Sequence, residues 1–545
     1  MVKNLLSLLS ARQNSILSGA VVLMATVAVS KVLGLVRDRL LAHAFTPDQT
    51  AVFFAAFRLP DLMFQILIFG AISVAFIPVF TDYLHHDGEK EAFDFASSIL
   101  NVVLVFFTAI SLVVFFLAGP LTALIVPGFN GPQQQITASL TQVIMLGQIL
   151  LVIGSFFAGI CQSYQRFIIP ALASVFYNVG IILGIVLLTP WWGIYGPAVG
   201  VVIGASLHIL AQIPLVSSLG FKHKLSFNLA SKGIREILGL MSVRTIGVTV
   251  EQLNETIGVI LASLISTSSV TFLTFAQHLQ TVPIGLFGAT LAQAALPVLS
   301  QEKARGEEES FKGTLLTTMH QIMFLSLPAT AILIVLRIPV VRLIFGASQF
   351  DWTATVLTGR TVAWLAVGLA AQAAVLLLVR AFYALKDTKT PVVVSIITVF
   401  LNVILSVFLV RVLHLQVWSL GISYAVASNL SLVLLIYFLH QKVGGFDKKD
   451  LFYPFLKMLF ASVVAALALY LPIKALDQLV FDTTKTVNLI ALTGIASVFG
   501  LSIYVLLVWL LKVQELDVFG NLLKKLYNFQ LHLKSEEIVH EPEAV

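Results

Sequence analysis

Charged side chains lie close together near the start of an otherwise apolar chain. An apolar run begins at Ile16 and ends in a segment that contains Lys31, Gly34, Arg37 and Asp38. Gly34 and Asp38 follow Lys31 by three and seven residues, so a helix places all three on one face. Each charge at the centre of a membrane helix costs about 2.5–3.5 kcal/mol, so this segment predicts a polar cavity, where glycine lets the helix bend. Snorkelling of basic side chains at a helix end is the alternative.

A second pair of charges follows in the next apolar segment, where Arg58 and Asp61 flank Pro60. Like the charges of the first segment, this pair is expected to line a polar cavity. An ion pair between Arg58 and Asp61 across one helical turn is the structural alternative.

Further ionisable groups recur in the middle of the chain. Arg244, Glu251 and Glu255 are separated by seven and four residues, so they form one stripe on a helix. Carboxylates at membrane depth can relay protons or hold cations, so we expect this stripe to couple transport to Na⁺, H⁺ or the membrane potential. An internal arginine–glutamate salt bridge is the alternative. His278 precedes Pro283 in the next span; a lone histidine is usually a satisfied interior residue, but the internal repeat described below places it near the equivalent of Arg58.

The composition is that of a membrane protein. Of the 545 residues, 58% are hydrophobic and 11% are charged, whereas soluble proteins have about 25% charged residues. The long apolar windows do not alternate with polar residues, which predicts an all-α polytopic membrane protein and excludes a β-barrel. The single cysteine, Cys161, excludes an internal disulfide and a cysteine-based metal site.

Several chemistries have no sequence signature. No glycine-rich phosphate loop ending in Gly-Lys-Ser/Thr occurs, so the chain is not expected to hydrolyse ATP. We expect no enzymatic activity, no cofactor and no resident metal. The net charge of +6 is better explained by membrane topology than by nucleic acid binding.

We predict fourteen membrane spans from the apolar windows. They cover residues 16–36, 50–81, 96–117, 138–161, 168–189, 194–217, 237–264, 270–299, 314–336, 355–385, 391–412, 417–440, 454–473 and 487–511. Residues 1–14 and 513–531 are expected to form interfacial helices, and the acidic tail 535–545 to be disordered.

Lysine and arginine predict the orientation of these spans. The stretches 118–140, 188–195 and 264–270 contain neither residue. The connections on the opposite side are basic through Arg166, Lys222, Lys224, Lys232, Arg235, Lys303, Arg305, Lys386, Lys389, Lys442, Lys448 and Lys449. By the positive-inside rule, both termini are therefore expected to be cytoplasmic.

The first part of the chain recurs in the second. Pro78 is echoed by Pro297 and Asn178 by Asn402, at nearly equal separations along the chain. This predicts two pseudo-symmetric six-helix lobes with a site at their interface. The expected division is 1–220 for the first lobe, 225–442 for the second, 450–512 for two further transmembrane helices and 513–545 for a cytoplasmic tail.

Five motifs together resemble the MurJ/MviN family of lipid II flippases, which belongs to the multidrug/oligosaccharidyl-lipid/polysaccharide exporter superfamily. They are Ser30–Asp38, Phe57–Leu62, Gly70–Phe80, Pro283–Ser300 and Phe382–Pro391. The resemblance implies two six-helix lobes and two C-terminal helices that form a groove for a lipid tail. It also implies that the chain flips the undecaprenyl-pyrophosphate-linked peptidoglycan precursor across the bacterial inner membrane.

The resemblance implies site residues and partners as well. The expected partners are this lipid-linked precursor, the lipid bilayer and the cell-wall synthesis machinery. The headgroup would be bound by Lys31, Gly34, Arg37, Asp38, Arg58, Asp61 and His278. The chain departs from the family at several positions: the paired arginines of the second span are Phe64 and Gln65, the acidic residue before Gly70 is Phe69, and the arginine of the eighth span is His278.

Three other functions compete with this interpretation. An exporter of the same superfamily could carry another polyprenyl-linked glycan or a multidrug substrate, although a cationic cargo would favour carboxylates over the basic groups of the first lobe. A membrane glycosyltransferase or polymerase is disfavoured by the short loops on the outer side. A scaffold without transport is disfavoured by the charges in the spans.

Overall fold

The structure is a computed structural model that describes residues 16–69, 76–227, 232–479 and 485–520. Within these ranges the chain is helical apart from its connections and one isolated bridge between Ala347 and Phe350. The predicted interfacial helix 1–14 and the tail 535–545 lie outside the described residues. Of the second predicted interfacial helix, 513–531, residues 513–520 are described, and residues 515–520 are helical.

The helices follow the predicted spans closely, often extending beyond them by a turn or two. The first part of the chain forms α2 (Ile16–Ala44), α3 (Pro47–Phe64), η1 (Gln65–Phe69), α4 (Ile77–His86), α5 (Glu89–Phe116), α6 (Ala118–Ile125), α7 (Gly131–Ser163), α8 (Ile168–Leu183), η3 (Gly184–Leu188), α9 (Thr189–Trp192) and α10 (Tyr195–Ser218).

The second part of the chain repeats this order. It forms α11 (Lys232–Ile265), α12 (Thr267–Pro283), η4 (Ile284–Ala289), α13 (Thr290–Arg305), α14 (Glu308–Val335), α15 (Arg337–Phe345), α16 (Trp352–Val367), α17 (Leu369–Ala384), α18 (Lys389–Val407), η5 (Phe408–Val412) and α19 (Trp418–Lys442). Two more helices follow, α20 (Lys448–Leu479) and α21 (Thr486–Leu510). The short helices α6, α9 and α15 were not predicted as separate elements.

The described helices account for the predicted number of spans. Twelve of them are long and apolar enough to cross a membrane, and the pair α16 and α17, bent by 43°, counts as a thirteenth span. With 29 residues, α2 is also long enough to cross and brings the number to fourteen. The predicted polytopic all-α class is confirmed.

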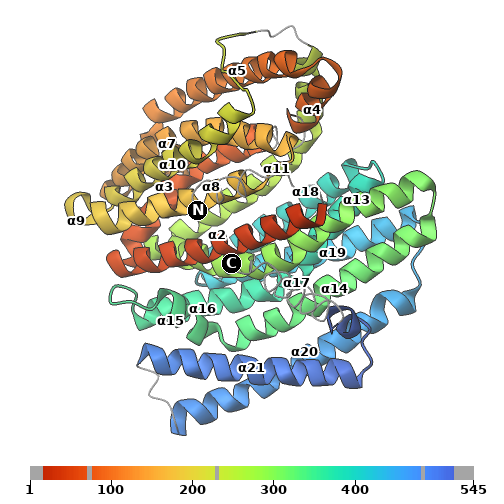
Figure 1. Ribbon diagram of the computed structural model, residues 1–545. Coiled ribbons are helices and arrows are strands. Elements are labelled where there is room, and N and C mark those ends of the chain that lie inside the picture. The colour runs from red at the N-terminus through yellow and green to blue at the C-terminus, as the bar shows by residue number, and fades with distance from the viewer. Residues whose placement is uncertain (1–15, 70–75, 228–231, 480–484, 521–545) are drawn as a thin grey trace, which may run out of the picture.

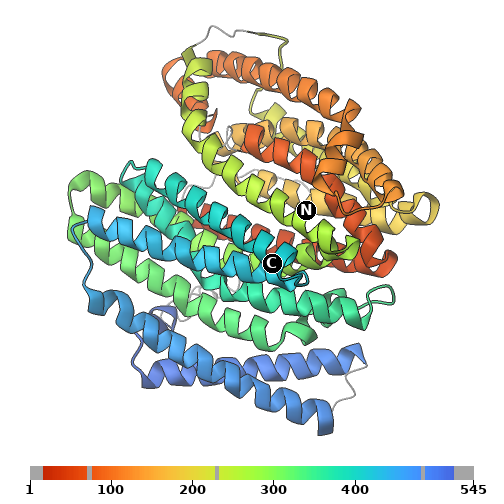
Figure 2. The same ribbon diagram turned by 180° about the vertical axis from the view of Figure 1, so that it is seen from behind.

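The helices form two lobes and an appended pair (Figures 1 and 2). In the first lobe, α7, α8 and α10 pack together, and α3 lies against α7. In the second lobe, α19 packs against α16, α17 and α18, and α12 packs against α16. The appended helices α20 and α21 pack on each other and on α14. Figure 1 shows them beyond the second lobe, on the side away from the first.

The internal repeat extends to irregularities of the backbone. Two helices of each lobe contain a π-helical segment, in which each turn holds an extra residue. These segments are η1 and η3 in the first lobe and η4 and η5 in the second. The separation of η4 from η1 equals that of Pro297 from Pro78, and the separation of η5 from η3 equals that of Asn402 from Asn178. The repeat seen in the sequence is therefore also a repeat of backbone geometry.

Glycines set the position of α8. A Cβ atom at Gly180 would lie 2.2 Å from Cα of Gly204, so α8 and α10 are in direct backbone contact there. No other residue fits this contact without moving a helix. The close packing fixes α8, which carries Tyr177 and Asn178, against α2.

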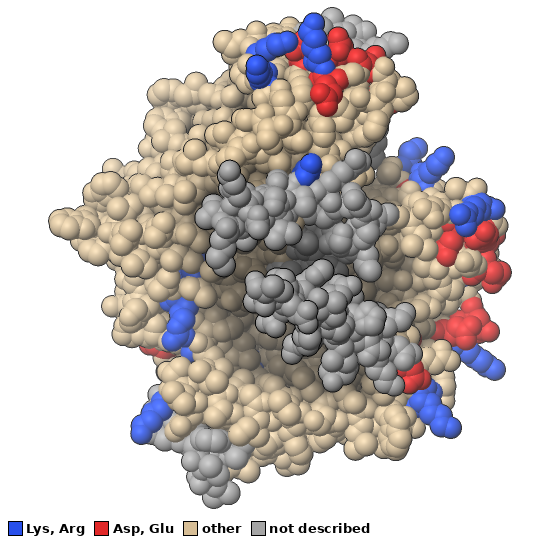
Figure 3. All heavy atoms as spheres, viewed as in Figure 1, with Lys and Arg blue, Asp and Glu red and all other residues tan. Residues whose placement is uncertain are grey.

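Two long helices lie at the boundary of the lobes. Helix α2 packs on α8 of the first lobe and contacts α12, α15 and η4 of the second. Helix α11 packs on α12 and α18 of its own lobe and contacts η1 and α4 of the first. Figure 3 shows most of the visible charged side chains near the molecule's edges, with a broad uncharged surface between them. The boundary is therefore where buried charges can be placed.

Candidate functional site

Asp38 is the centre of one charged cluster at this boundary. Its side chain is 1% exposed. Arg37 donates to Oδ1 from Nε at 3.0 Å and from Nη2 at 2.8 Å. His278 of the second lobe has its Nδ1 atom 2.6 Å from Oδ2. Both carboxylate oxygens are thus occupied, one from each lobe, and the buried charge is compensated.

Neighbouring side chains hold this cluster in place. The Oδ1 atom of Asn178 on α8 accepts a long hydrogen bond from Arg37 at 3.4 Å, and its Nδ2 atom donates to Ser30 Oγ at 3.2 Å. The imidazole of His278 meets the ring of Phe54 on α3 edge to face, with centroids 5.8 Å apart. The predicted proximity of the second and eighth spans is confirmed by this contact and by the packing of α3 on α12.

Arg58 is the centre of a second cluster between the lobes. It is buried, and its guanidinium donates only to α11 among the described residues. Its Nε atom donates to Thr256 Oγ1 at 2.9 Å, and Nη1 donates to Glu255 Oε2 at 2.9 Å. The Nη2 atom donates to the carbonyl and the side-chain oxygen of Gln252 at 2.8 and 2.6 Å. The bonds to α11 replace the alternative of an ion pair with Asp61, whose carboxylate is hydrogen-bonded to Gln65.

Lys31 differs from the two arginines. It is half-buried on α2, beside Gly285 of η4 in the second lobe. Its ammonium group makes no ion pair or hydrogen bond with any other described residue, so it is the cation at this boundary that is free to take an anionic ligand. The helix is continuous at Gly34, which has open space beside it, so α2 does not open there in this structure.

The residues of the expected coupling stripe have different surroundings. Glu255 points to the first lobe and pairs with Arg58. Glu251, one turn away, is exposed. The side chain of Arg244 lies outside the described residues. The alternative of a salt bridge within α11 therefore does not apply to Glu255, whose partner is in the other lobe.

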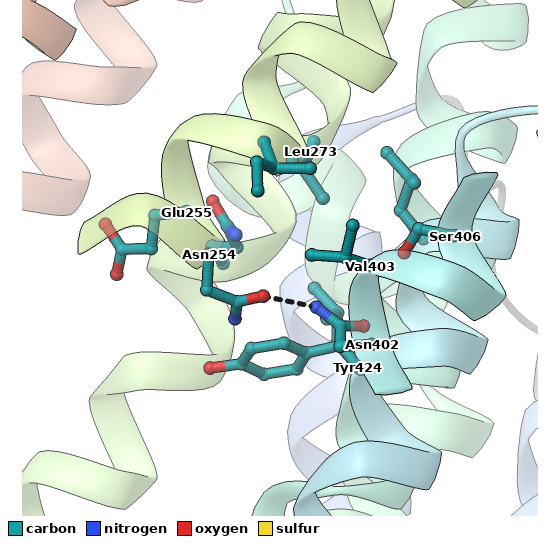
Figure 4. A pocket seen from close by; sticks show the side chains of 12 residues that line it. Asn254, Glu255, Leu273, Asn402, Val403, Ser406 and Tyr424 are labelled. Atoms are coloured by element: carbon teal, nitrogen blue, oxygen red, sulfur yellow. Dashed lines mark hydrogen bonds between the residues drawn. The ribbon is translucent and has the colours of Figure 1, made fainter. Parts of the chain in front are cut away.

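A small polar pocket lies inside the second lobe, next to Glu255 (Figure 4). Asn254 and Asn402 meet there, with Nδ2 of Asn402 donating to Oδ1 of Asn254 at 2.7 Å. Oδ1 of Asn402 is buried and has no partner among the described residues. Tyr424 and Ser406 line the same pocket. Figure 4 shows the Glu255 carboxylate directed away from Asn402, so the pocket and the ion pair occupy opposite sides of α11.

Contacts between the lobes are concentrated at one end of the molecule, which we call the closed end. It is formed by the connections around residues 45–47, 126–130, 265–267 and 345–352. Among described residues, the hydrogen bonds between the lobes at this end join Thr271 to Pro47 O, Ser268 to Asp48, Thr267 to Gln133, Gly128 N to Ser263, and Arg39 to Leu343 O and Ile344 O. Further along the boundary, the clusters of Asp38 and Arg58 also join the lobes by direct hydrogen bonds.

Sequence reasoning identified the charged residues but not their partners. Gln252 and Thr256 bind Arg58, and Tyr424 lines the pocket, yet none was proposed for a site. The available signal was that Asn178 and Asn402 occupy equivalent positions in the repeat. A polar residue in an apolar helix is costly unless it is hydrogen-bonded, so each of the two asparagines indicated a polar partner nearby.

Comparisons with known proteins agree with this architecture. The family model described as "Lipid II flippase MurJ" matches residues 41–491. A probable lipid II flippase MurJ of Buchnera aphidicola is 29% identical over 419 residues, covering 76% of this chain and 82% of that protein. The solved structure "Lipid II flippase MurJ, inward closed conformation" has a TM-score of 0.74 at 21% identity and covers 89% of this chain and 98% of that one.

A multidrug transporter provides a second structural comparison. An inward-facing MATE family transporter of the MOP superfamily has a TM-score of 0.64 at 14% identity, covering 78% of this chain and 98% of that one. At these identities the solved structures establish the fold alone. The family model spans most of the chain and includes Arg58, Glu255 and His278. It begins after Lys31, Arg37 and Asp38. The chain therefore belongs to the MurJ family of lipid II flippases.

Proposed function

We propose that this protein flips lipid II, the undecaprenyl-pyrophosphate-linked peptidoglycan precursor, by alternating access between its two lobes. The observation that carries the proposal is the pair of charged clusters between lobes whose described surfaces expose many large hydrophobic side chains. The polyprenyl tail can remain in lipid while only the headgroup enters a polar site. A gradient of ions, the membrane potential or supply of the substrate would drive the cycle.

The protein is placed in the bacterial inner membrane with both termini in the cytoplasm. This orientation rests on the positive-inside rule, because the closed end coincides with loops that lack lysine and arginine around 126–130 and 265–267. The closed end then faces outward, and the structure is an inward-facing state. Reporter fusions after Gly128, Trp192 and Ser268 should be extracytoplasmic, and one after Lys224 should be cytoplasmic. A cytoplasmic signal at Gly128 would contradict the orientation.

The headgroup site is assigned to Lys31, Arg37, Arg58 and His278, supported by Asp38. In this state Lys31 is the cation without an anionic partner among the described residues. The diphosphate would meet Lys31 first, and Arg37, which is 18% exposed, would offer its remaining N–H groups. Arg58 has most of its donors engaged by α11 and would contribute only if the lobes separate.

Transport of lipid II to the outer leaflet tests this assignment, in proteoliposomes and by complementation of a conditional flippase strain. Arg37→Ala should abolish transport while the protein still inserts, and Arg37→Lys should restore it only in part because a point charge cannot make the forked contact. Arg411→Ala, an exposed arginine on η5, is the matched control and should transport normally. Wild-type transport by the double variant Arg37→Ala/Arg58→Ala would show that the headgroup binds elsewhere.

Coupling to an ion is assigned to Glu251 and Glu255. Glu251 is exposed and lies one turn from Glu255, which pairs with Arg58 of the first lobe. The surroundings of both carboxylates therefore change when the lobes move relative to each other. Glu251→Gln should change how transport depends on membrane potential, Na⁺ or H⁺ more than it changes folding. Full activity of Arg244→Ala/Glu251→Ala would mean that the stripe is structural.

A cationic multidrug cargo is the competing function. Such a cargo needs carboxylates that are free to bind it, but Asp38 and Glu255 are both paired with basic side chains. Transport of a cationic dye by the purified protein, without transport of lipid II, would favour this alternative.

A further inference from the structure

The two charged clusters are related by the internal repeat. Asp38 and Glu255 each lie on the first helix of their lobe, α2 and α11, and Arg58 and His278 each lie on the second, α3 and α12. Both pairs are separated along the chain by nearly the same interval as Pro78 and Pro297. The acid of each lobe bonds the base of the other lobe. The clusters are therefore two copies of one crossed contact between the lobes.

The residues beside each acid repeat as well. Arg37 precedes Asp38 and bonds Asn178, while Asn254 precedes Glu255 and bonds Asn402. These bonds anchor α2 to α8 and α11 to α18, within one lobe in each case. The acid of each crossed contact thus lies on a helix that is anchored within its own lobe. Movement of one lobe against the other therefore changes the distance between the acid and its base.

The two copies differ in the chemistry of the base. Arg58 keeps its charge at every physiological pH. His278 carries an imidazole, the side chain whose charge ordinarily changes between pH 5 and pH 8. One contact is consequently a permanent ion pair, and the other depends on a proton.

The geometry identifies the position of that proton. The ionised carboxylate of Asp38 can only accept, so Nδ1 of His278, at 2.6 Å from Oδ2, carries a hydrogen whether the ring is neutral or charged. Nε2 has no hydrogen-bond partner among the described residues, and the side chain is 33% exposed. The exchangeable proton therefore binds Nε2, which solvent between the lobes can reach.

We propose that His278 and Asp38 form a proton-binding latch for the closed end. With a proton on Nε2, the pair is an imidazolium–carboxylate ion pair that holds α12 to α2 and keeps the closed end shut. When the proton leaves, the neutral imidazole still donates a hydrogen bond to the carboxylate but the ion-pair attraction is lost, and the lobes separate more readily at this end. The latch adds control by pH to the alternating-access cycle and rests on the proposed function.

Other charges around His278 influence the strength of this latch. The charged side chains on the described parts of the helices that pack against α12 are Lys31, Arg37, Asp38 and Arg39 on α2, Asp48, Arg58 and Asp61 on α3, Glu251 and Glu255 on α11, and Arg360 on α16. Among them, Asp38 alone forms a direct bond with His278. Lys31 and Arg37 oppose a further positive charge, and the carboxylate of Asp38, placed between Arg37 and His278, offsets this repulsion.

Distances across the closed end test the latch in the full-length protein in nanodiscs. Spin labels on Gln135→Cys in the first lobe and Ser348→Cys in the second occupy exposed positions at that end, and the native Cys161 is buried. Loss of the imidazolium charge removes an ion-pair attraction whose size corresponds to about a fivefold change in a two-state ratio. We expect the ratio of open to closed distances to rise about fivefold between pH 5.5 and pH 8.

Four variants show which residues carry the pH response. His278→Gln should show no change with pH, and His278→Arg should remain closed at both pH values and guards against misfolding of the first variant. His43→Gln, which removes an exposed histidine in the last turn of α2, should respond as the wild type does. Glu255→Gln should raise the open fraction at both pH values and leave the pH response intact.

Two outcomes would overturn the proposal. One is a wild-type protein whose distances do not change with pH, and the other is a His278→Gln variant that retains the wild-type response. The measurement uses no lipid II, so its failure leaves the proposed transport standing. Conversely, a protein that fails to flip lipid II but shows the expected pH response retains the latch.

Discussion

The contact between Arg58 and α11 allows a quantitative prediction, because Arg58 and Glu255 differ in how far their side chains are buried. Arg58→Gln removes a buried guanidinium that makes four hydrogen bonds to Gln252, Glu255 and Thr256. Breaking a buried charge pair costs about 3–5 kcal/mol when the remaining charge stays buried. The side chain of Glu255 is 46% exposed, however, so its charge keeps much of its hydration. We therefore expect a loss at the lower limit, about 3 kcal/mol.

The reciprocal change should be at least as costly. Glu255→Gln leaves Arg58 with its bonds to Gln252 and Thr256 but removes the carboxylate that compensates its charge, and the Arg58 side chain is 9% exposed. Removing one partner of a buried pair costs about 3–5 kcal/mol when the remaining charge stays buried. The double variant leaves neither charge, so it should lose little more than Arg58→Gln alone, and the coupling energy should approach the cost of Glu255→Gln.

Unfolding by sodium dodecyl sulfate in mixed micelles, followed by tryptophan fluorescence, measures these differences for the intact chain. Arg411→Gln, which alters an exposed arginine, is the control and should change the free energy of unfolding by less than about 0.5 kcal/mol. A loss no larger than that of the control for Arg58→Gln would refute the reasoning, since it would mean that the guanidinium does not join the lobes and is free for a ligand. A smaller loss for Glu255→Gln than for Arg58→Gln would refute the role given to the exposure of Glu255.

Three other changes test separate parts of the structure. Gly128→Ala should open the closed end in the distance measurement and slow transport, because its Cβ would lie 1.9 Å from Ser263 O; Gly119→Ala, with open space around it, is the control. Lys31→Ala should weaken lipid II binding several-fold in a titration. It should cost little stability, because the Lys31 ammonium group makes no hydrogen bond or ion pair with a described residue. Burial would raise the pKa of Asp387, but hydrogen bonds from Lys442 and Thr390 lower the pKa to about 2. Its contribution to stability should therefore be full above about pH 4 and disappear as the pH falls through about 2, so Asp387→Asn should lower the unfolding temperature at pH 7 and have no effect near pH 2.

The sequence alone determined the class, the spans and the repeat. Lipid cannot hydrogen-bond a bare backbone, so long apolar windows must become helices, and the observed helices cover the predicted spans, often extending beyond them by a turn or two. The spacing of Pro78 and Pro297 revealed the repeat because equivalent helices keep their breaks at equivalent positions, which the π-helical segments also show. The predicted contact of the second and eighth spans followed from that symmetry.

Tertiary structure decided which charge meets which. Asp61 lies one helical turn from Arg58, and the sequence favoured neither a local ion pair nor a ligand role for this arginine. In the structure α3 packs against α11, and Arg58 pairs with Glu255 instead. In the same way, His278 has no acidic neighbour in its own span, and only the crossing of α2 and α12 brings it to Asp38. Local spacing fixes the face of a helix on which a charge lies, whereas its partner depends on how the lobes meet, because ion pairing in a buried interface is set by distances across helices that are far apart in the chain.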